Sequence, residues 1–245
     1  MAEATNQPEA HRVIEVREKE SPPPAWGTAA RDVSRWPALA AVIVAIVLYV
    51  TLPDKLYYGP VWLLPAVQGL MIIPLAVSRG RRRNEEQPWQ RWTSLSIAAV
   101  MSAANIGSLF RLIGGLIGSG IVAGHKIQAH DLIFWSAQIW LTNVLVFGLW
   151  YWELDRGGPG ARAETRHREP DFLFPQMATP ECAPRLWQPS FVDYLYVSFT
   201  NATAFSPTDT MPLTEWAKLL MMVQAMASLL TVALVAARAV NVLGS

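Results

Sequence analysis

The chain has 245 residues, of which 52% are hydrophobic and only 16% are charged. Soluble domains usually carry about a quarter charged residues, so this composition excludes most soluble globular classes and indicates a polytopic membrane protein. The formal net charge of +1 gives no basis for nucleic-acid binding. The single cysteine, Cys182, excludes an internal disulfide framework and a thiolate metal cluster.

The first 35 residues are strongly polar and contain the triple proline Pro22–Pro24. Such a segment cannot bury enough apolar surface to offset the entropy lost on ordering, so residues 1–35 are predicted to be a disordered tail.

Five apolar runs follow, each long enough for a helix to cross a hydrocarbon core of about 30 Å. Helices are expected because the alternating pattern of a membrane barrel is absent. The sequence therefore predicts an all-α, polytopic membrane bundle with four spans within residues 36–152, a polar linker at 153–190, and a half helix with a terminal span within 191–243. The five runs are Trp36–Leu52, Pro60–Val77, Trp92–Phe110, Leu132–Trp152 and Leu219–Ala237.

The distribution of Lys and Arg predicts the orientation. Two of the loops between the first four runs hold only Lys55 and Lys126, whereas five arginines lie between the second and third runs, and Arg31 and Arg35 lie just before the first. The N-terminus is therefore predicted to be cytoplasmic, in a plasma-membrane protein, and the Arg-rich linker 153–190 falls on the same side.

The C-terminal unit has an unusual layout. Phe191–Phe205 is apolar but short for a span, Ser206–Pro212 is a polar turn, and a full-length apolar helix follows. A half-length helix, a polar loop and a full span are typical of a re-entrant pore unit, in which irregular backbone is tolerated at membrane depth because it is buried in protein or lines water.

This layout resembles the pore module of two-span potassium channels. Pro212 aligns with the proline after the selectivity filter and Asp209 with its aspartate, while Phe199 and Thr203 align with the aromatic residue and the threonine of the pore helix. The filter residues themselves align with Ser206, Pro207 and Thr208.

The filter positions depart from that family, because its glycines are missing and Pro207 has a fixed φ and no backbone donor. A potassium-selective filter is therefore not expected. The resemblance implies either a shared shape or a pore of other selectivity, in which a pathway for monovalent cations would run along Ser206, Pro207, Thr208, Asp209, Gln224, Ser228 and Thr231.

A second resemblance covers about residues 36–243. The chain is similar to a bacterial family of uncharacterised integral membrane proteins, domain of unknown function thirteen forty-five. The resemblance implies an architecture and no chemistry. It is carried by Leu149-Trp150-Tyr151-Trp152, by Asp171-Phe172-Leu173-Phe174-Pro175, by Trp187 with Phe191, Asp193, Tyr194, Leu195, Tyr196, Ser198 and Phe199, by Thr208-Asp209, and by Ala237 to Asn241.

Several polar residues allow two interpretations. Gln224, Ser228 and Thr231 share one face of the last helix with Arg238, and they either line a pore or form hydrogen bonds between helices. Arg111, inside the third span, either pairs with Asp209 or Asp131 or extends to the outer surface. Asp209 is either a cation-attracting group or an ordinary turn residue.

The leading hypothesis is an ion-conducting or ion-gating membrane protein that works as a homo-oligomer in the lipid bilayer, since one half helix per chain encloses a pore only when several subunits combine. The alternative is a non-conducting membrane scaffold or assembly protein. A small-solute transporter is a third option, although no internal repeat supports it. No motif indicates an enzyme, a cofactor or a metal site.

Overall fold

The structure is a computed structural model that describes residues 34–53, 56, 62, 65–66, 88–118, 121–122, 125–126, 129–163, 168–184, 187–204 and 209–243. The predicted disordered tail, apart from its last two residues, and nearly all of the predicted span Pro60–Val77 lie outside the described residues.

The described residues are mostly helical, in agreement with the predicted helical class. Within them, three helices are long and apolar enough to cross a membrane: α4 (Pro88–Gly118), α5 (Ala129–Leu154) and α9 (Glu215–Leu243). The fourth apolar helix, α2 (Trp36–Val50), has 15 residues and is shorter.

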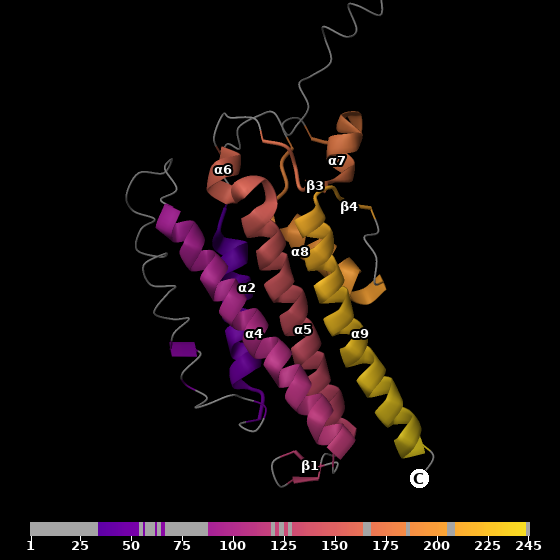
Figure 1. Ribbon diagram of the computed structural model, residues 1–245. Coiled ribbons are helices and arrows are strands. Elements are labelled where there is room, and N and C mark those ends of the chain that lie inside the picture. Colours follow the sequence, from indigo (N-terminus) through magenta and orange to yellow (C-terminus); the bar gives the residue numbers. More distant parts are fainter. Residues whose placement is uncertain are drawn as a thin grey trace, which may run out of the picture.

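Helix α5 is the centre of the bundle, and α2, α4, α8 (Phe191–Ala204) and α9 all pack against it (Figure 1). Of the apolar stretch of α5, 67% is buried inside the bundle, whereas only 22% of the apolar stretch of α9 is buried. A two-stranded hairpin of β1 (Ile121–Val122) and β2 (His125–Lys126) lies between α4 and α5. α9 thus lies at the periphery, with most of its apolar surface free to contact lipid or another protein.

The segment after α5 folds against the C-terminal end of this helix and is more than a connector. It contains η4 (Asp155–Gly157), α6 (Pro159–Ala163), β3 (Phe172–Leu173), α7 (Pro175–Ala178) and η5 (Pro180–Cys182). Phe172, Phe174 and Met177 are buried in the main hydrophobic core. This end of the bundle, which we call the linker end, is therefore well packed.

Helix α8 has 14 residues and reaches only partway along α5. It begins at the linker end, where Phe191 packs on Trp152 with ring centroids 5.9 Å apart, and near its other end Trp140 Nε1 donates to the Ala202 carbonyl (3.5 Å). The chain then returns, because β4 (Met211–Pro212) pairs with β3 in the register Phe172↔Pro212. The chain therefore enters and leaves this half-length excursion at the linker end (Figure 1).

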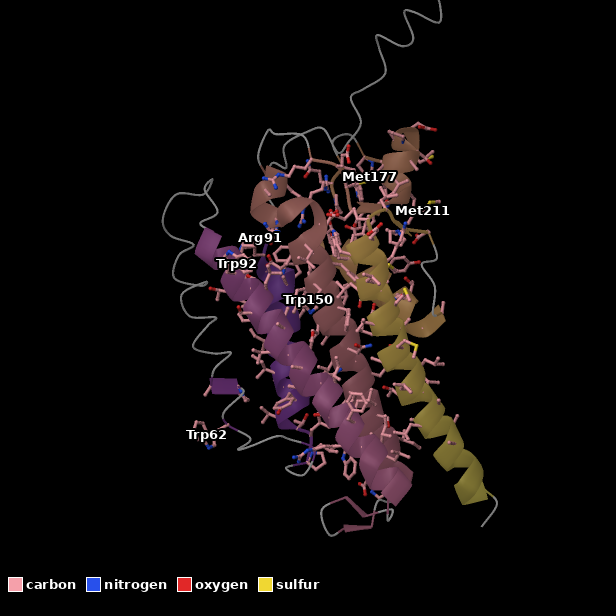
Figure 2. The ribbon with its side chains drawn as sticks, in the orientation of Figure 1. Trp62, Arg91, Trp92, Trp150, Met177 and Met211 are labelled. Atoms are coloured by element: carbon pink, nitrogen blue, oxygen red, sulfur yellow. The ribbon has the colours of Figure 1, made fainter. Side chains whose placement is uncertain are left out.

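The outside of the bundle is apolar and carries aromatic residues at the linker end. Arg91 and Trp92 lie toward the same end as Met177 and Met211 (Figure 2). Trp36 and Trp92, the first residue of α2 and the fifth of α4, are 68% and 70% exposed. Exposed tryptophans at the ends of apolar helices are typical of a membrane interface.

The close packing of α5 and α8 depends on Gly148. A Cβ atom at this position would lie 3.3 Å from both the Cα and the Cδ1 atoms of Leu195. Gly148→Leu is therefore expected to push the two helices apart and to lower stability by about 1–3 kcal/mol. The matched control is Gly114→Leu in α4, where the glycine is exposed and nothing lies within 4 Å of an added Cβ. Thermal unfolding in mild detergent measures both, and equal midpoints for the two variants would contradict the expectation.

Candidate functional site

Two clusters of buried polar residues stand out in the described part of the chain. The first, which we call the interhelical polar cluster, lies between α5, α8 and α9. Polar side chains recur at helical spacing on the facing surfaces of these helices, so packing the helices together brings them into contact. Its members are Asn143, Tyr151, Ser198, Asn201, Gln224 and Ser228.

Gln224 is the hub of this cluster and is fully buried. Its Nε2 donates to the carbonyl (2.9 Å) and the hydroxyl (2.7 Å) of Ser198. Its Oε1 accepts from the Tyr151 hydroxyl (2.5 Å) and from Asn201 Nδ2 (2.8 Å). The amide thus has its two donors and two acceptor sites used by α5 and α8.

The other members extend the cluster along α9. Asn143 Nδ2 donates to the Ser228 hydroxyl (2.9 Å), and the Ser198 hydroxyl donates to the Val144 carbonyl (2.6 Å). Thr231 is buried too, but its hydroxyl donates to the carbonyl of Ala227, one turn back in the same helix (2.8 Å). The stripe Gln224, Ser228 and Thr231 thus faces the interior of the bundle. Beyond the first turn of α9, the exposed large side chains that the structure describes are apolar: Leu219, Met222, Val223, Met226, Leu229, Leu230 and Val232.

Of the remaining residues of the predicted pathway, the structure describes Asp209 alone. Ser206, Pro207 and Thr208 lie outside the described residues. Asp209 is exposed at the linker end, next to β4, and accepts a long hydrogen bond from the Thr210 hydroxyl (3.4 Å).

The two predicted structural charges lie elsewhere. Arg111 is partly buried on α4 near Tyr49, the penultimate residue of α2, whereas Asp209 lies at the linker end, so the fold does not bring these two residues together. Arg238 belongs to α9, but its side chain lies outside the described part of the chain.

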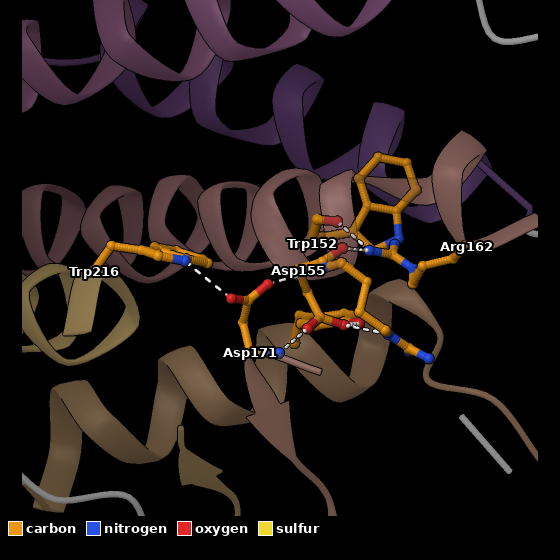
Figure 3. Close-up of polar contacts among 7 residues, drawn as sticks. Trp152, Asp155, Arg162, Asp171 and Trp216 are labelled. Carbon is orange, nitrogen blue, oxygen red and sulfur yellow. Dashed lines mark hydrogen bonds and ion pairs between the residues drawn. The ribbon is translucent and has the colours of Figure 1, made fainter. Parts of the chain in front are cut away.

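The second cluster, which we call the end cluster, is centred on Asp155 at the linker end (Figure 3). Asp155 is fully buried. Its Oδ2 accepts from the Tyr194 hydroxyl (2.5 Å) and from Arg156 Nε (3.1 Å), and its Oδ1 accepts from the Asp171 amide (2.8 Å). One carboxylate thus joins the end of α5 to α8 and to the strand-forming segment that contains β3.

Asp171 continues the network toward α9. Its Oδ2 accepts from the Arg156 amide (2.8 Å), and its Oδ1 accepts from Trp216 Nε1 (2.9 Å). The α5 helix ends here because Arg156, Gly157 and Gly158 have positive φ values of 52°, 85° and 98°. This conformation suits glycine and is strained for Arg156, which the two aspartates hold in place.

Arg162 caps the same helix end. Its Nη1 donates to the carbonyls of Trp152 (2.8 Å) and Asp155 (2.7 Å). Its guanidinium also lies over the rings of Trp152, 5.9 Å from the centroid, and Tyr194, 5.2 Å from the centroid. A cation at a helix C-terminus is favoured by the helix dipole, so Arg162 stabilises the end of α5.

The aromatic residues that carry the second sequence resemblance meet around this cluster. Phe172 packs on Tyr151 (5.1 Å between ring centroids) and Tyr194 (6.3 Å), and Phe174 packs on Tyr194 (5.3 Å) and Trp187 (5.8 Å). The end of α5, the segment that contains β3, and the segment with Trp187 and the first turn of α8 thereby form one aromatic core.

Sequence reasoning did not identify Asp155, Arg156 or Arg162 as site residues. One local signal was present. Asp155 and Arg156 follow a long apolar run and are followed by two glycines, which is typical of a helix end. Nothing in the surrounding polar sequence indicates that Arg162 is buried.

Among the described residues, no group of three or more His, Cys, Asp or Glu side chains is placed to hold a metal ion. No protein-family model, no curated protein and no solved structure matches the chain. The resemblances to potassium-channel pore modules and to the uncharacterised bacterial membrane family therefore stay predictions from sequence.

Proposed function

We propose that this chain is an integral membrane protein that works as a non-conducting scaffold or assembly protein, with the half helix α8 and the polar stripe of α9 as packed structural elements. The observation that carries the proposal is the saturated amide of Gln224, whose donors and acceptors are all used by α5 and α8. A pore-lining amide needs hydrogen-bonding capacity left over for water or ions.

The channel hypothesis is the second candidate, and one observation favours it. The chain descends along α8 and returns to β4 at the same end of the bundle before α9 begins, which is the path of a re-entrant pore unit. The exposed apolar face of α9 would then be the surface on which copies of the chain assemble.

The proposed orientation puts the linker end in the cytoplasm. At this end, Arg35 and Arg162 lie over the Trp152 ring, Arg156 pairs with Asp155, and Arg91 lies near Gly158. Clustering of arginine at one end of a membrane bundle supports a cytoplasmic location for that end and for the N-terminus.

Flux through proteoliposomes tests the proposed function. Purified protein, shown to be folded by near-ultraviolet circular dichroism, is expected to give no cation flux above that of empty liposomes at any applied potential. Asp209→Asn is measured beside it. Flux that falls in Asp209→Asn would overturn the scaffold proposal and support conduction through the polar turn.

A further inference from the structure

Arg162 has an anion-binding edge that the described residues leave unused. Its Nη1 serves the two carbonyls at the end of α5, whereas its Nε and Nη2 atoms are buried and have no hydrogen-bond partner in the described part of the chain. Nε–H and Nη2 form the side-on fork with which arginine binds two oxygens of one anion. Buried donors are nearly always paired in folded proteins, so this edge favours a bound acceptor.

Arg156 has a further unused donor at the same end of α5. Its Nη2 is also buried and unpartnered within the described segments. Arg156 and Arg162 are only 6% and 5% exposed. Asp155 and Asp171 do not satisfy these donors in the structure: their carboxylate oxygens accept instead from the Nε and amide of Arg156, from Tyr194, from Trp216 and from the Asp171 amide.

Gly157 lets a further arginine approach the same turn, and another arginine lies near Gly158. A Cβ atom at Gly157 would lie 2.6 Å from Arg168 Nη1, and one at Gly158 would lie 3.9 Å from Arg91 Nε. Arg91 Nε is buried and unpartnered among the described residues too. With Arg35 over Trp152, the described part of this end holds five arginines and three acids, Glu153, Asp155 and Asp171, so these eight side chains together carry a net positive charge.

We propose that this arginine group, which we call the anion site, binds a phosphoryl anion at the end of α5. A phosphate monoester offers several oxygens and up to two negative charges, which matches the fork of Arg162 and the added donors of Arg156 and Arg91 better than a carboxylate does. The group belongs either to a phospholipid headgroup or to a soluble phosphate. The exposed Trp36 and Trp92 at this end set the anion site near headgroup level if the chain spans a membrane as proposed.

Ligand-dependent stability of the full-length protein tests the anion site, because a ligand that binds only the folded state raises its unfolding midpoint. In one arm, inorganic phosphate is titrated into protein in uncharged detergent at constant ionic strength. In the other, nanodiscs of phosphatidylcholine are compared with nanodiscs that also contain phosphatidic acid. A shift in the first arm assigns the site to soluble phosphate, and a shift in the second arm alone assigns it to lipid.

Two variants and one control make the assay specific. Arg162→Lys keeps the charge and a donor for the helix end but loses the fork, and it is expected to weaken binding about tenfold. Arg91→Gln, which removes a guanidinium whose Nε has no hydrogen-bond partner among the described residues, keeps the test valid if Arg162→Lys does not fold, and it is expected to weaken binding severalfold. Lys218→Gln removes one exposed charge in the first turn of α9 and is expected to bind like the parent. The absence of a shift in both arms, or an equal loss in Lys218→Gln, would overturn the proposal.

Discussion

Asp155→Asn is expected to lower the free energy of unfolding by about 3–5 kcal/mol, the usual cost of breaking a buried ion pair from one side. The carboxylate is fully buried and accepts from Tyr194, from the Arg156 side chain and from the Asp171 amide. Asparagine keeps the shape but has only one acceptor oxygen, and its amide would meet a donor. The buried Arg156 guanidinium would also lose its counter-charge, which is costly at low dielectric.

Asp193→Asn is the matched control, because it makes the same chemical change in a less buried setting. Asp193 Oδ2 accepts from the backbone amide and the hydroxyl of Ser190, both at 2.7 Å, in the first turn of α8. Such a capping interaction contributes about 1 kcal/mol. Unfolding by detergent titration or heat measures both variants. Equal losses, or a loss below about 1 kcal/mol for Asp155→Asn, would mean that the end cluster contributes little to stability.

The helices of this chain could be predicted from sequence because long apolar runs indicate segments that are removed from water, by protein or by lipid. The run Trp36–Leu52 begins at the residue where α2 begins, and the expected half helix Phe191–Phe205 ends one residue beyond α8. The last apolar run, Leu219–Ala237, covers only the middle of its helix. α9 spans Glu215–Leu243 because a helix continues through polar residues at its ends, which a hydrophobic run does not include.

The polar contacts could not be predicted in the same way, because they depend on how helices face one another. The stripe of Gln224, Ser228 and Thr231 appears in the sequence as polar residues at helical spacing. This spacing does not show whether the polar side chains face water or other protein side chains. The partners on α5, Asn143 and Tyr151, lie within an apolar run, where nothing in the sequence indicates that they face α9. Arg162 lies in a polar stretch, where burial of a charge is the exception.

Gln224→Leu is expected to lower the free energy of unfolding by about 2–3 kcal/mol. The substitution keeps a similar volume but removes four hydrogen bonds, and it leaves the buried Tyr151 hydroxyl without its acceptor. Hydrogen bonds between membrane helices contribute about 0.6 kcal/mol each on average, and an unsatisfied buried group costs about 1–3 kcal/mol. Thr231→Val is the control in the same stripe, because Thr231 bonds only within its own helix, and a loss within about 0.5 kcal/mol is expected.

A double-mutant cycle then separates hydrogen bonding from packing. Tyr151→Phe removes the hydroxyl that donates to Gln224 Oε1 (2.5 Å), so the double variant Gln224→Leu with Tyr151→Phe no longer contains an orphaned phenol. Its loss of stability is expected to be smaller than the sum of the two single losses by about 1 kcal/mol. Strictly additive losses would mean that the two groups do not interact energetically. Gln224 would then have bonding capacity to spare for water, and the pore hypothesis would gain over the scaffold.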